Sequence, residues 1–382
     1  MANTFGTLVT SVQANLDTVL REQIGYIPAV SINAEAAQAA IGQVIQYPIA
    51  PVMVAMDGTA VCCADNPCPP DQAFGVGNMV VDHDRIVNLC WTAEEDRQVN
   101  NSYGYSGANF RDNQIQQGIR TLVNEVETSI AAVGYNAAQV YTPASTTLFS
   151  TQADNFKDLT LIRKLLIDNA TPDSDLHLVM NTLSGAQVRN LYNLTRANEN
   201  ASDATVRRGS LLELMNFQLH ESYAAGVNRT NGSGTAYEVV GAQTAGDTTV
   251  PVDTGTGTIL SGQLITFAGN TTVYTVISFS GGIITLNRGL TGPLADNALV
   301  TMGAVYSPQL AFKREAIVLA ARLPSLIGGE DSAEERAYIT DPYSGLTFSL
   351  AQYRNRRATT WELGLVWGVK MVKPEMAVLI PG

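Results

Sequence analysis

The sequence is poor in the residues and motifs that carry enzymatic chemistry. It has three histidines, His83, His177 and His220, and each falls in a different expected element. No GxSxG nucleophile motif, complete GxGxxG dinucleotide motif or GxxxxGK phosphate loop occurs. His220-Glu221 is not followed by the second histidine of a zinc-protease helix. We therefore expect no catalytic, cofactor-binding or metal-binding residues.

Cysteine is also scarce, with four residues at Cys62, Cys63, Cys68 and Cys90. The first three lie in the proline-rich stretch CCADNPCPP, and the two CxxC-like pairs of a zinc site are absent. Small reduced residues at a loop tip are the favoured interpretation. A disulfide or a metal site at these cysteines stays open as an alternative.

Long apolar runs and basic residues are equally few. No stretch of about 18 apolar residues predicts a membrane helix, and the first residues lack the basic and apolar regions of a secretory signal. The formal net charge is −12, from 23 basic and 35 acidic residues. Because phosphate binding depends on lysine and arginine, contact with nucleic acid is expected to be weak. We expect a soluble protein that is made in the cytoplasm and contacts no membrane.

What the sequence does contain is a long amphipathic strand near its end, from Thr359 to Lys370. In TTWELGLVWGVK, large apolar side chains alternate with small or charged ones, which is the period of a strand with one apolar face. The apolar positions are Trp361, Leu363, Leu365, Trp367 and Val369. At ~3.3 Å per residue, the strand would run about 36 Å.

A partner of matching length is expected from Asn109 to Val133. Its apolar residues recur at helical spacing, at Ile115, Ile119, Leu122, Val126 and Ile130. At ~1.5 Å per residue, this helix would be about 38 Å long. We predict that the strand lies along the helix.

The residues before this helix are expected to form extended limbs. Residues 1–40 have a loose apolar pattern and are interpreted as an arm that gains structure by lying on something else. The runs VIQYPIAPVMVA and FGVGNMVVDHDRIVNLCW then predict two extended strands joined by a long loop. Such a hairpin cannot bury both faces within its own chain, so a neighbouring molecule is implied.

The middle of the chain predicts a mixed α/β layer. We expect a helix from Asp154 to Asp168 with Asp154 as its N-cap, and a buried strand from Leu176 to Met180. A further helix is expected from Ser184 to Ala197, with Ser184 as its cap.

Composition changes near Asn231, after which glycine and threonine dominate up to Tyr306 and Arg288 is the one basic residue. Short apolar runs between glycine turns predict a compact β-barrel or sandwich inserted into the α/β region. Extended patterning resumes from Phe312 to Arg322. Leu346, Phe348 and Leu350 predict a strand that pairs with the long one, and PEMAVLIPG predicts a last buried strand.

Two polar clusters have competing interpretations. Asp82-His83-Asp84 is interpreted as a solvated strand edge, because a pleated strand turns neighbouring side chains to opposite faces, with a metal or catalytic imidazole as the less favoured alternative. The arginines before the long strand, at 354, 356 and 357, are interpreted as a solvated turn. The alternative is a set of salt bridges across a subunit contact.

The order of these parts resembles the major capsid (coat) protein of tailed bacteriophages, with the Hong-Kong-97-type fold. The resemblance rests on SGQLITFAGNTTVYTV, AFKREAIVLAARLP and WELGLVWGVKMVKPEMAVLIPG, and is clearest over residues 255–382. It is nearer to the coat protein of short-tailed Salmonella phages, which carries a β-barrel insertion domain. The resemblance implies an α+β fold with an N-terminal arm, a long hairpin, a peripheral domain built on a spine helix, and an axial domain.

Carried onto this chain, the resemblance implies the following domains: an arm at 1–40, an extended hairpin at 41–91, a peripheral domain at 92–139 and 330–370, an axial domain at 140–230, 307–329 and 371–382, and an inserted β-barrel at 231–306. It implies a structural protein without catalysis that assembles with identical subunits into hexamers and pentamers of an icosahedral shell. The shell would enclose double-stranded DNA with only weak contact, would be assembled in the host cytoplasm, and would have scaffolding, portal and decoration proteins as candidate partners.

Two other functions are kept for comparison. The β-rich insert could be the recognition module of a carbohydrate-binding or adhesive surface protein. A hydrolase using Asp82 and His83 is a third hypothesis.

Overall fold

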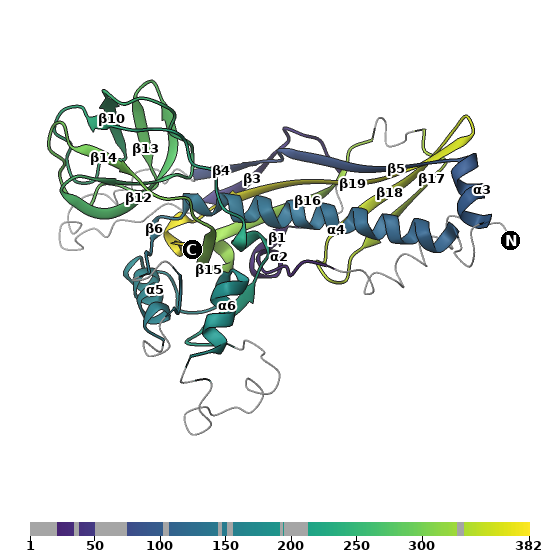
Figure 1. Ribbon diagram of the computed structural model, residues 1–382, viewed down its shortest axis with the longest axis horizontal. Coiled ribbons are helices and arrows are strands. Elements are labelled where there is room, and N and C mark those ends of the chain that lie inside the picture. The colour runs from purple at the N-terminus through teal and green to yellow at the C-terminus, as the bar shows by residue number, and fades with distance from the viewer. Residues whose placement is uncertain are drawn as a thin grey trace, which may run out of the picture.

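The computed structural model describes residues 21–33, 38–49, 75–101, 107–143, 147–150, 156–191, 194, 213–326 and 332–382. Figure 1 shows an elongated molecule, in which a long sheet and one long helix run side by side. A barrel lies at one end of the sheet, and a smaller α/β lobe lies below the same end. Among the described helices, none is long and apolar enough to cross a membrane.

The long sheet is centred on β19 (Ala358–Met371), which is the strand predicted from Thr359 to Lys370. One edge of β19 pairs with β5 (His83–Thr92), and the other edge pairs with β18 (Thr347–Asn355) and β16 (Ile317–Pro324). Beyond these lie β17 (Glu335–Thr340), paired to β18, and the short β1 (Ser31–Asn33) and β2 (Gln38–Ala39), both parallel to β16. The predicted pairing of residues 346–350 with the long strand is confirmed by the partners Leu350 and Leu363.

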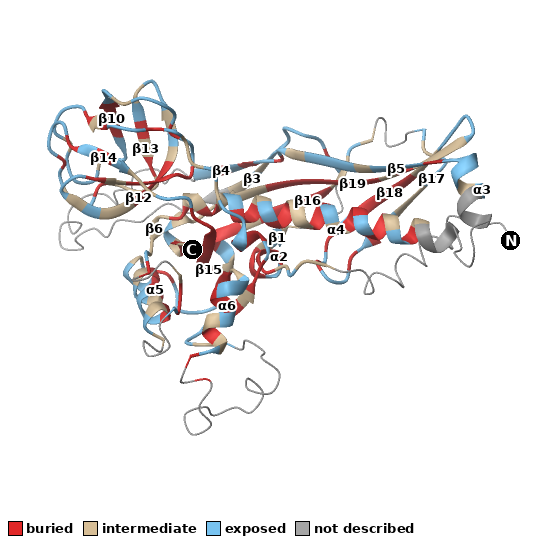
Figure 2. Ribbon diagram, in the orientation of Figure 1, coloured by how far each residue is buried: buried red, intermediate tan, exposed pale blue. Residues whose placement is uncertain are grey.

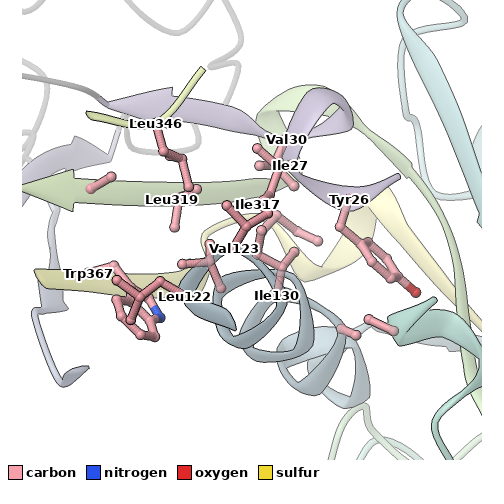
Figure 3. Close-up of a cluster of buried hydrophobic side chains, with 14 of the residues drawn as sticks. Tyr26, Ile27, Val30, Leu122, Val123, Ile130, Ile317, Leu319, Leu346 and Trp367 are labelled. Atoms are coloured by element: carbon pink, nitrogen blue, oxygen red, sulfur yellow. The ribbon is translucent and has the colours of Figure 1, made fainter. Parts of the chain in front are cut away.

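The long helix, α4 (Gly107–Val133), lies along one face of this sheet (Figure 1), as the alternating pattern predicts. Figure 2 shows buried residues on the α4 face that meets the sheet and exposed residues on the opposite face. The buried face contains the residues expected at helical spacing, namely Ile115, Ile119, Leu122, Val126 and Ile130. Trp367 of β19 is fully buried in the same cluster (Figure 3), and its indole nitrogen donates to Ser129 Oγ at 3.3 Å.

The opposite face of β19 is crossed closely by other parts of the chain. A Cβ on Gly364 would lie 2.9 Å from Pro324 Cγ, and one on Gly368 would collide with the carbonyl oxygen of Val80. The small residues in the sequence pattern therefore mark close backbone approach, for which glycine is required. Val366 is buried on this face as well, so the middle of β19 is covered on both sides.

The predicted hairpin divides into a ribbon and a sheet strand. Of its two runs, the first forms β3 (Val44–Ile49), and the second breaks at Val81 and Asp82 into β4 (Gly75–Val80) and β5. Only β4 pairs with β3, whereas β5 pairs with β19 over ten residues, which holds it in the long sheet. The short α3 (Ala93–Asn101) follows β5.

The α/β lobe has a five-stranded sheet in the order β6-β20-β15-β7-β8 with two helices beside it. The strands are β6 (Gln139–Val140), β7 (Leu176–Met180), β8 (Phe217–Glu221), β15 (Pro308–Lys313) and β20 (Ala377–Pro381). The buried strand at 176–180 and the last buried strand are thus confirmed. Short 3-10 turns lie at Gly134–Asn136, Ala224–Gly226, Arg314–Ala316 and Pro374–Met376.

Both helices of the lobe begin at other residues than predicted. The helix α5 (Lys157–Asp168) has Phe156 at its N-cap position, and Asp154, the predicted cap, lies outside the described residues. The helix α6 (Thr182–Arg189) begins before Ser184, because Asn181 Oδ1 accepts from the backbone N–H of Ser184 at 2.8 Å and caps the helix instead.

The glycine-rich region forms a closed six-stranded barrel, as predicted, in the order β10-β13-β12-β11-β14-β9. Its strands are β9 (Tyr237–Val239), β10 (Thr249–Asp253), β11 (Leu264–Phe267), β12 (Asn270–Ser280), β13 (Ile283–Leu286) and β14 (Leu299–Met302). The barrel has its own buried apolar cluster. Asn287 of the barrel donates to the carbonyl of Ala137, just after α4. Arg229, which precedes the barrel, donates to the carbonyls of Ala132 in α4 and Ser261 in the barrel, so the barrel is tied to the end of α4.

Candidate functional site

The ribbon formed by β3 and β4 is the clearest candidate for a surface that meets another molecule. The two strands pair only with each other among the described strands, which leaves the outer backbone edges without strand partners. Apolar side chains are exposed on both strands, with Val44, Val76 and Val80 at 46%, 57% and 47% of full exposure. A two-stranded ribbon with exposed apolar residues is marginal alone and gains stability by burial against a partner.

The base of the ribbon is nevertheless fixed to the body. Val81 is buried with Val366 and Ala39, next to the half-buried Ile45. Lys370 of β19 donates to the carbonyl oxygen of Asn78 at 2.5 Å. The body therefore determines the direction in which the ribbon leaves it.

A second feature holds the arm against α4. The carboxylate of Glu127 accepts backbone N–H bonds from Gly25, Tyr26 and Ile27 at 2.5 to 2.9 Å, and a hydroxyl bond from Ser222 at 2.7 Å. Burial raises the pKa of Glu127, and these four donors partly offset that rise. Residues 25–27 are thus fixed on α4 of their own chain, whereas residues 1–20 of the predicted arm lie outside the described residues.

Two ion pairs extend this attachment, and we call them together with Glu127 the arm clamp. Arg21 donates to both carboxylate oxygens of Asp341 at 2.7 Å. Arg120 and Asn124 of α4 donate to the carboxylate of Glu22. The hydrogen bond from Arg120 lowers the pKa of Glu22 to about 2. The sequence analysis did not identify Glu127. A charged residue one turn before the apolar Ile130 of the predicted helix was a signal that could have indicated a buried carboxylate.

The comparisons with known proteins bear on the fold. No protein-family model matches the chain, and no curated protein matches its sequence. A solved structure from Mycobacterium phage Che8 matches 95% of this chain and 92% of its own at a TM-score of 0.51 and 14% identity. The capsid structure of the cyanophage P-SCSP1u matches 95% of this chain and 89% of its own at a TM-score of 0.50 and 11% identity.

This chain has the phage major capsid fold. The likeness extends over nearly the whole chain. With sequence identity this low, the structural likeness shows the fold alone. The strands of the ribbon, at residues 44–49 and 75–80, lie within the range 41–91 that the sequence predicts for an extended hairpin.

The Asp82 and His83 cluster lies at the edge of a groove between α4 and β5. Asp82 precedes the strand, so its carboxylate reaches His83 Nδ1 at 2.6 Å, which the argument from alternating strand faces did not anticipate. The His83 ring stacks on Trp367 with centroids 5.1 Å apart. Ser129 in the same groove donates to the Glu125 carbonyl and accepts from Trp367. These contacts give each group a structural role.

The other two histidines lie together in the lobe, which sequence analysis missed. The parallel pairing of β7 and β8 brings His177 Nδ1 within 3.1 Å of His220 Nε2. Asp175 and Arg314 both reach His177 Nε2, at 3.1 and 3.2 Å. Burial lowers the pKa of both imidazoles, that of His220 to about 4, and the Arg314 charge adds to this effect. Strand order decides this contact, so no local pattern predicts it.

The remaining candidates are partly described. Cys90 is an exposed free thiol on β5, whereas Cys62, Cys63 and Cys68 lie outside the described residues. Among the described residues, no group of three or more potential ligands is arranged to hold a metal ion. Arg354, Arg356 and Arg357 are exposed at the turn between β18 and β19, as predicted.

Proposed function

We propose that this protein is the major capsid protein of a tailed bacteriophage and that its copies assemble into an icosahedral head around double-stranded DNA. The observation that supports this most strongly is the β3 and β4 ribbon, which exposes apolar residues and open strand edges on a chain with the phage major capsid fold. Apolar area of this kind is characteristic of a surface that is covered on association.

The proposed contact is heterologous, because the ribbon of one copy would lie on a different surface of the next. Repetition of such a contact by rotation closes rings, here hexamers and pentamers. We assign the ribbon to the extended hairpin, α4 and the long sheet to the peripheral domain, and the lobe to the axial domain. We further propose that the barrel corresponds to the insertion domain of the short-tailed Salmonella phage coat protein.

The net charge of −12 is consistent with an inner surface that does not hold packaged DNA tightly. In this proposal the protein is a component of the virion and is assembled in the bacterial cytoplasm. Scaffolding, portal and decoration proteins are its proposed additional partners. The role is structural and requires no catalytic residue.

The test is to express the full chain, alone and with a candidate scaffolding protein from the same genome. Sedimentation velocity and negative-stain electron microscopy are expected to show large closed particles. Small monomers in every condition, with or without the scaffolding protein, would contradict the proposal.

The carbohydrate-binding alternative gains no support from the barrel. Binding pockets for small ligands usually present accessible aromatic side chains. In the fully described barrel, Tyr237, Phe267 and Tyr274 are buried, and Phe279 packs edge-on against Tyr237. Absence of sugar binding by the full chain on a glycan array is the expected result.

A further inference from the structure

The barrel carries an apolar patch on the outside of four neighbouring strands. Antiparallel pairing places Ile283 of β13 opposite Pro251 of β10, and the Pro251 carbonyl accepts the N–H of Val240, directly after β9, at 2.9 Å. Ile283 and Val240 are 46% and 42% exposed, and Leu299 of β14 is 46% exposed. Residues opposite each other in antiparallel strands point to the same face, so these side chains are neighbours. We call these four residues the outer patch.

The outer patch points away from the rest of the molecule. In the closed order β10-β13-β12-β11-β14-β9, β9 lies three strands from β12 in either direction. It is therefore on the opposite side of the barrel from β12, which contacts β6 and the 3-10 turn after α4. Figure 1 agrees, because β12 is the labelled barrel strand nearest to β6 and β10 lies farther from it. The patch is thus directed towards solvent.

Carboxylates lie beside the outer patch. Glu238 of β9 is directly opposite Asp253 of β10 on one side and Leu299 of β14 on the other. Asp296 accepts the backbone N–H of Gly241, two residues after β9, at 2.7 Å. Like charges that face each other across two strands destabilise a sheet. The pair at 238 and 253 therefore costs stability unless a cation approaches it from outside.

The barrel has no cation of its own for this face. Between residues 231 and 306 the sequence has four acidic residues and a single basic one, Arg288. Arg288 donates to Gln139 of the lobe, so it lies on the side of the barrel that meets the body. Among the described residues, no basic side chain forms an ion pair with the three carboxylates beside the patch.

We propose that the outer patch binds a separate protein that presents lysine or arginine side chains beside apolar ones. Apolar contact would remove the patch from water, and the cations would relieve the repulsion between the opposed carboxylates. The inference goes beyond the proposed function, because the partner is not a copy of this chain.

Charge disfavours the other occupants. A second copy carries the same excess of 35 acidic over 23 basic residues, so an approaching copy is repelled from an acidic face. Nucleic acid and anionic membranes are repelled for the same reason. A small cation could neutralise the carboxylates but would leave the apolar side chains exposed. A basic protein surface with apolar residues satisfies both halves of the site.

The first experiment measures the binding of two short labelled peptides to the full chain by fluorescence anisotropy. One peptide alternates lysine with valine, and the other alternates glutamate with valine. The lysine peptide is expected to bind at least about tenfold more tightly, and added salt should weaken its binding. Equal binding of the two peptides, or binding of neither, would overturn the inference.

Matched variants show whether the lysine peptide binds at the outer patch. Glu238→Gln with Asp253→Asn should weaken its binding about tenfold and should keep or raise the melting temperature, because the repulsion is removed. Glu94→Gln with Glu335→Gln makes the same charge change at two exposed positions outside the barrel and should have little effect on binding. Equal weakening by both pairs would show only a general attraction to an acidic chain, which contradicts the proposal.

The apolar half of the site is tested separately. Ile283→Ser with Leu299→Ser should weaken binding of the lysine peptide several-fold, because apolar contact area is lost. Leu183→Ser with Leu260→Ser, at positions 54% and 40% exposed elsewhere on the chain, should leave binding unchanged. Identical affinities of the two variants would overturn the role given to the patch.

A carbodiimide then joins the peptide lysines to the carboxylates that they contact, and mass spectrometry locates the links. Links at Glu238, Asp253 or Asp296 are expected. Links spread evenly over exposed carboxylates of the whole chain would overturn the inference. Loss of particle formation in the variant Glu238→Gln with Asp253→Asn would assign the face to contacts between copies, and would overturn the inference while leaving the proposed function intact.

Discussion

Single residues determine how closely different segments of this chain approach each other. Gly368 is the clearest case, because the Val80 carbonyl occupies the space that any side chain would need. His220 is another, since it lies half-buried against the buried His177 and near Arg314, where protonation is unfavourable. Both sites predict measurable effects of small substitutions.

Gly368→Ala should lower the free energy of unfolding by roughly 1 to 3 kcal/mol, because the new methyl group forces β4 away from β19. Urea denaturation followed by tryptophan fluorescence measures the change. Gly292→Ala is the matched control, since a Cβ there meets no atom within 4 Å. Equal stability of the two variants would show that β4 does not pack closely against β19 at Gly368.

The His220 pKa predicts a dependence of stability on pH. Its value of about 4 in the folded protein is below the ordinary 6.5, so the unfolded chain takes up a proton first as the pH falls. The free energy of unfolding should therefore decrease from pH 6.5 towards pH 4. His220→Gln should flatten this decrease, and His83→Gln, on the exposed Asp82 pair, should retain it. An unchanged profile in His220→Gln would contradict the assignment.

At the scale of elements, the α4 and β19 pair organises the core, and the arm clamp adds the N-terminal residues to it. The alternating pattern of β19 and the helical pattern of α4 are local, so the sequence alone was enough to predict both elements and their contact. Arg288, the one basic residue of the barrel region, donates a hydrogen bond to Gln139 in β6 of the lobe. This contact could not be read from composition, because it depends on where the barrel sits.

Trp367→Ala should cost roughly 3 to 5 kcal/mol, since the ring is fully buried between β19 and α4. Denaturation in urea gives the value, with Tyr338→Ala on the exposed edge strand β17 as a control expected to change little. Normal stability of Trp367→Ala would mean that the apolar face of β19 has been assigned to the wrong side.

The arm clamp predicts a second pH effect, at lower pH. The pKa of Glu22 is about 2 in the folded protein against an ordinary 4.5, so its stabilising contribution is complete above pH 4.5 and is lost as the pH falls towards 2. Glu22→Gln should remove this loss. Glu125→Gln, a change of the half-exposed α4 residue that pairs with Arg85, should keep it. Thermal melts between these pH values distinguish the two variants.

The remaining features of the candidate site could not be predicted from the sequence, because they depend on contacts between distant residues or on a choice between similar residues. The division of the predicted hairpin at Val81 follows from the pairing of β5 with β19, a contact between residues far apart in the chain. The meeting of His177 and His220 needs the strand order of the lobe. The cap of α6 is Asn181 and not the predicted Ser184. The sequence could not distinguish them, because both residue types are good caps and only three positions separate them.

At the scale of the whole molecule, the proposed function requires that folding and association depend on different surfaces. The ribbon residues Val44 and Val76 are exposed, so Val44→Ser with Val76→Ser should leave the melting temperature of the isolated subunit unchanged. The same change should reduce the yield of particles several-fold, because apolar area that would be buried between copies is removed. Val240→Ser, exposed on the barrel, is the control. Normal particle yield from the ribbon variant would exclude the ribbon from the contact.

The ion pair between Arg21 and Asp341 joins residues 320 positions apart, so this contact forms only after Asp341 has been synthesised. At ~5 to 20 residues per second, the ribosome needs at least about 15 s to travel that distance. During that interval Arg21 lacks its partner, whereas the contacts of Glu22 and of residues 25–27 with α4 can form after about 100 further residues. The ion pair of Arg21 with Asp341 is therefore the last contact of the arm clamp to form during synthesis.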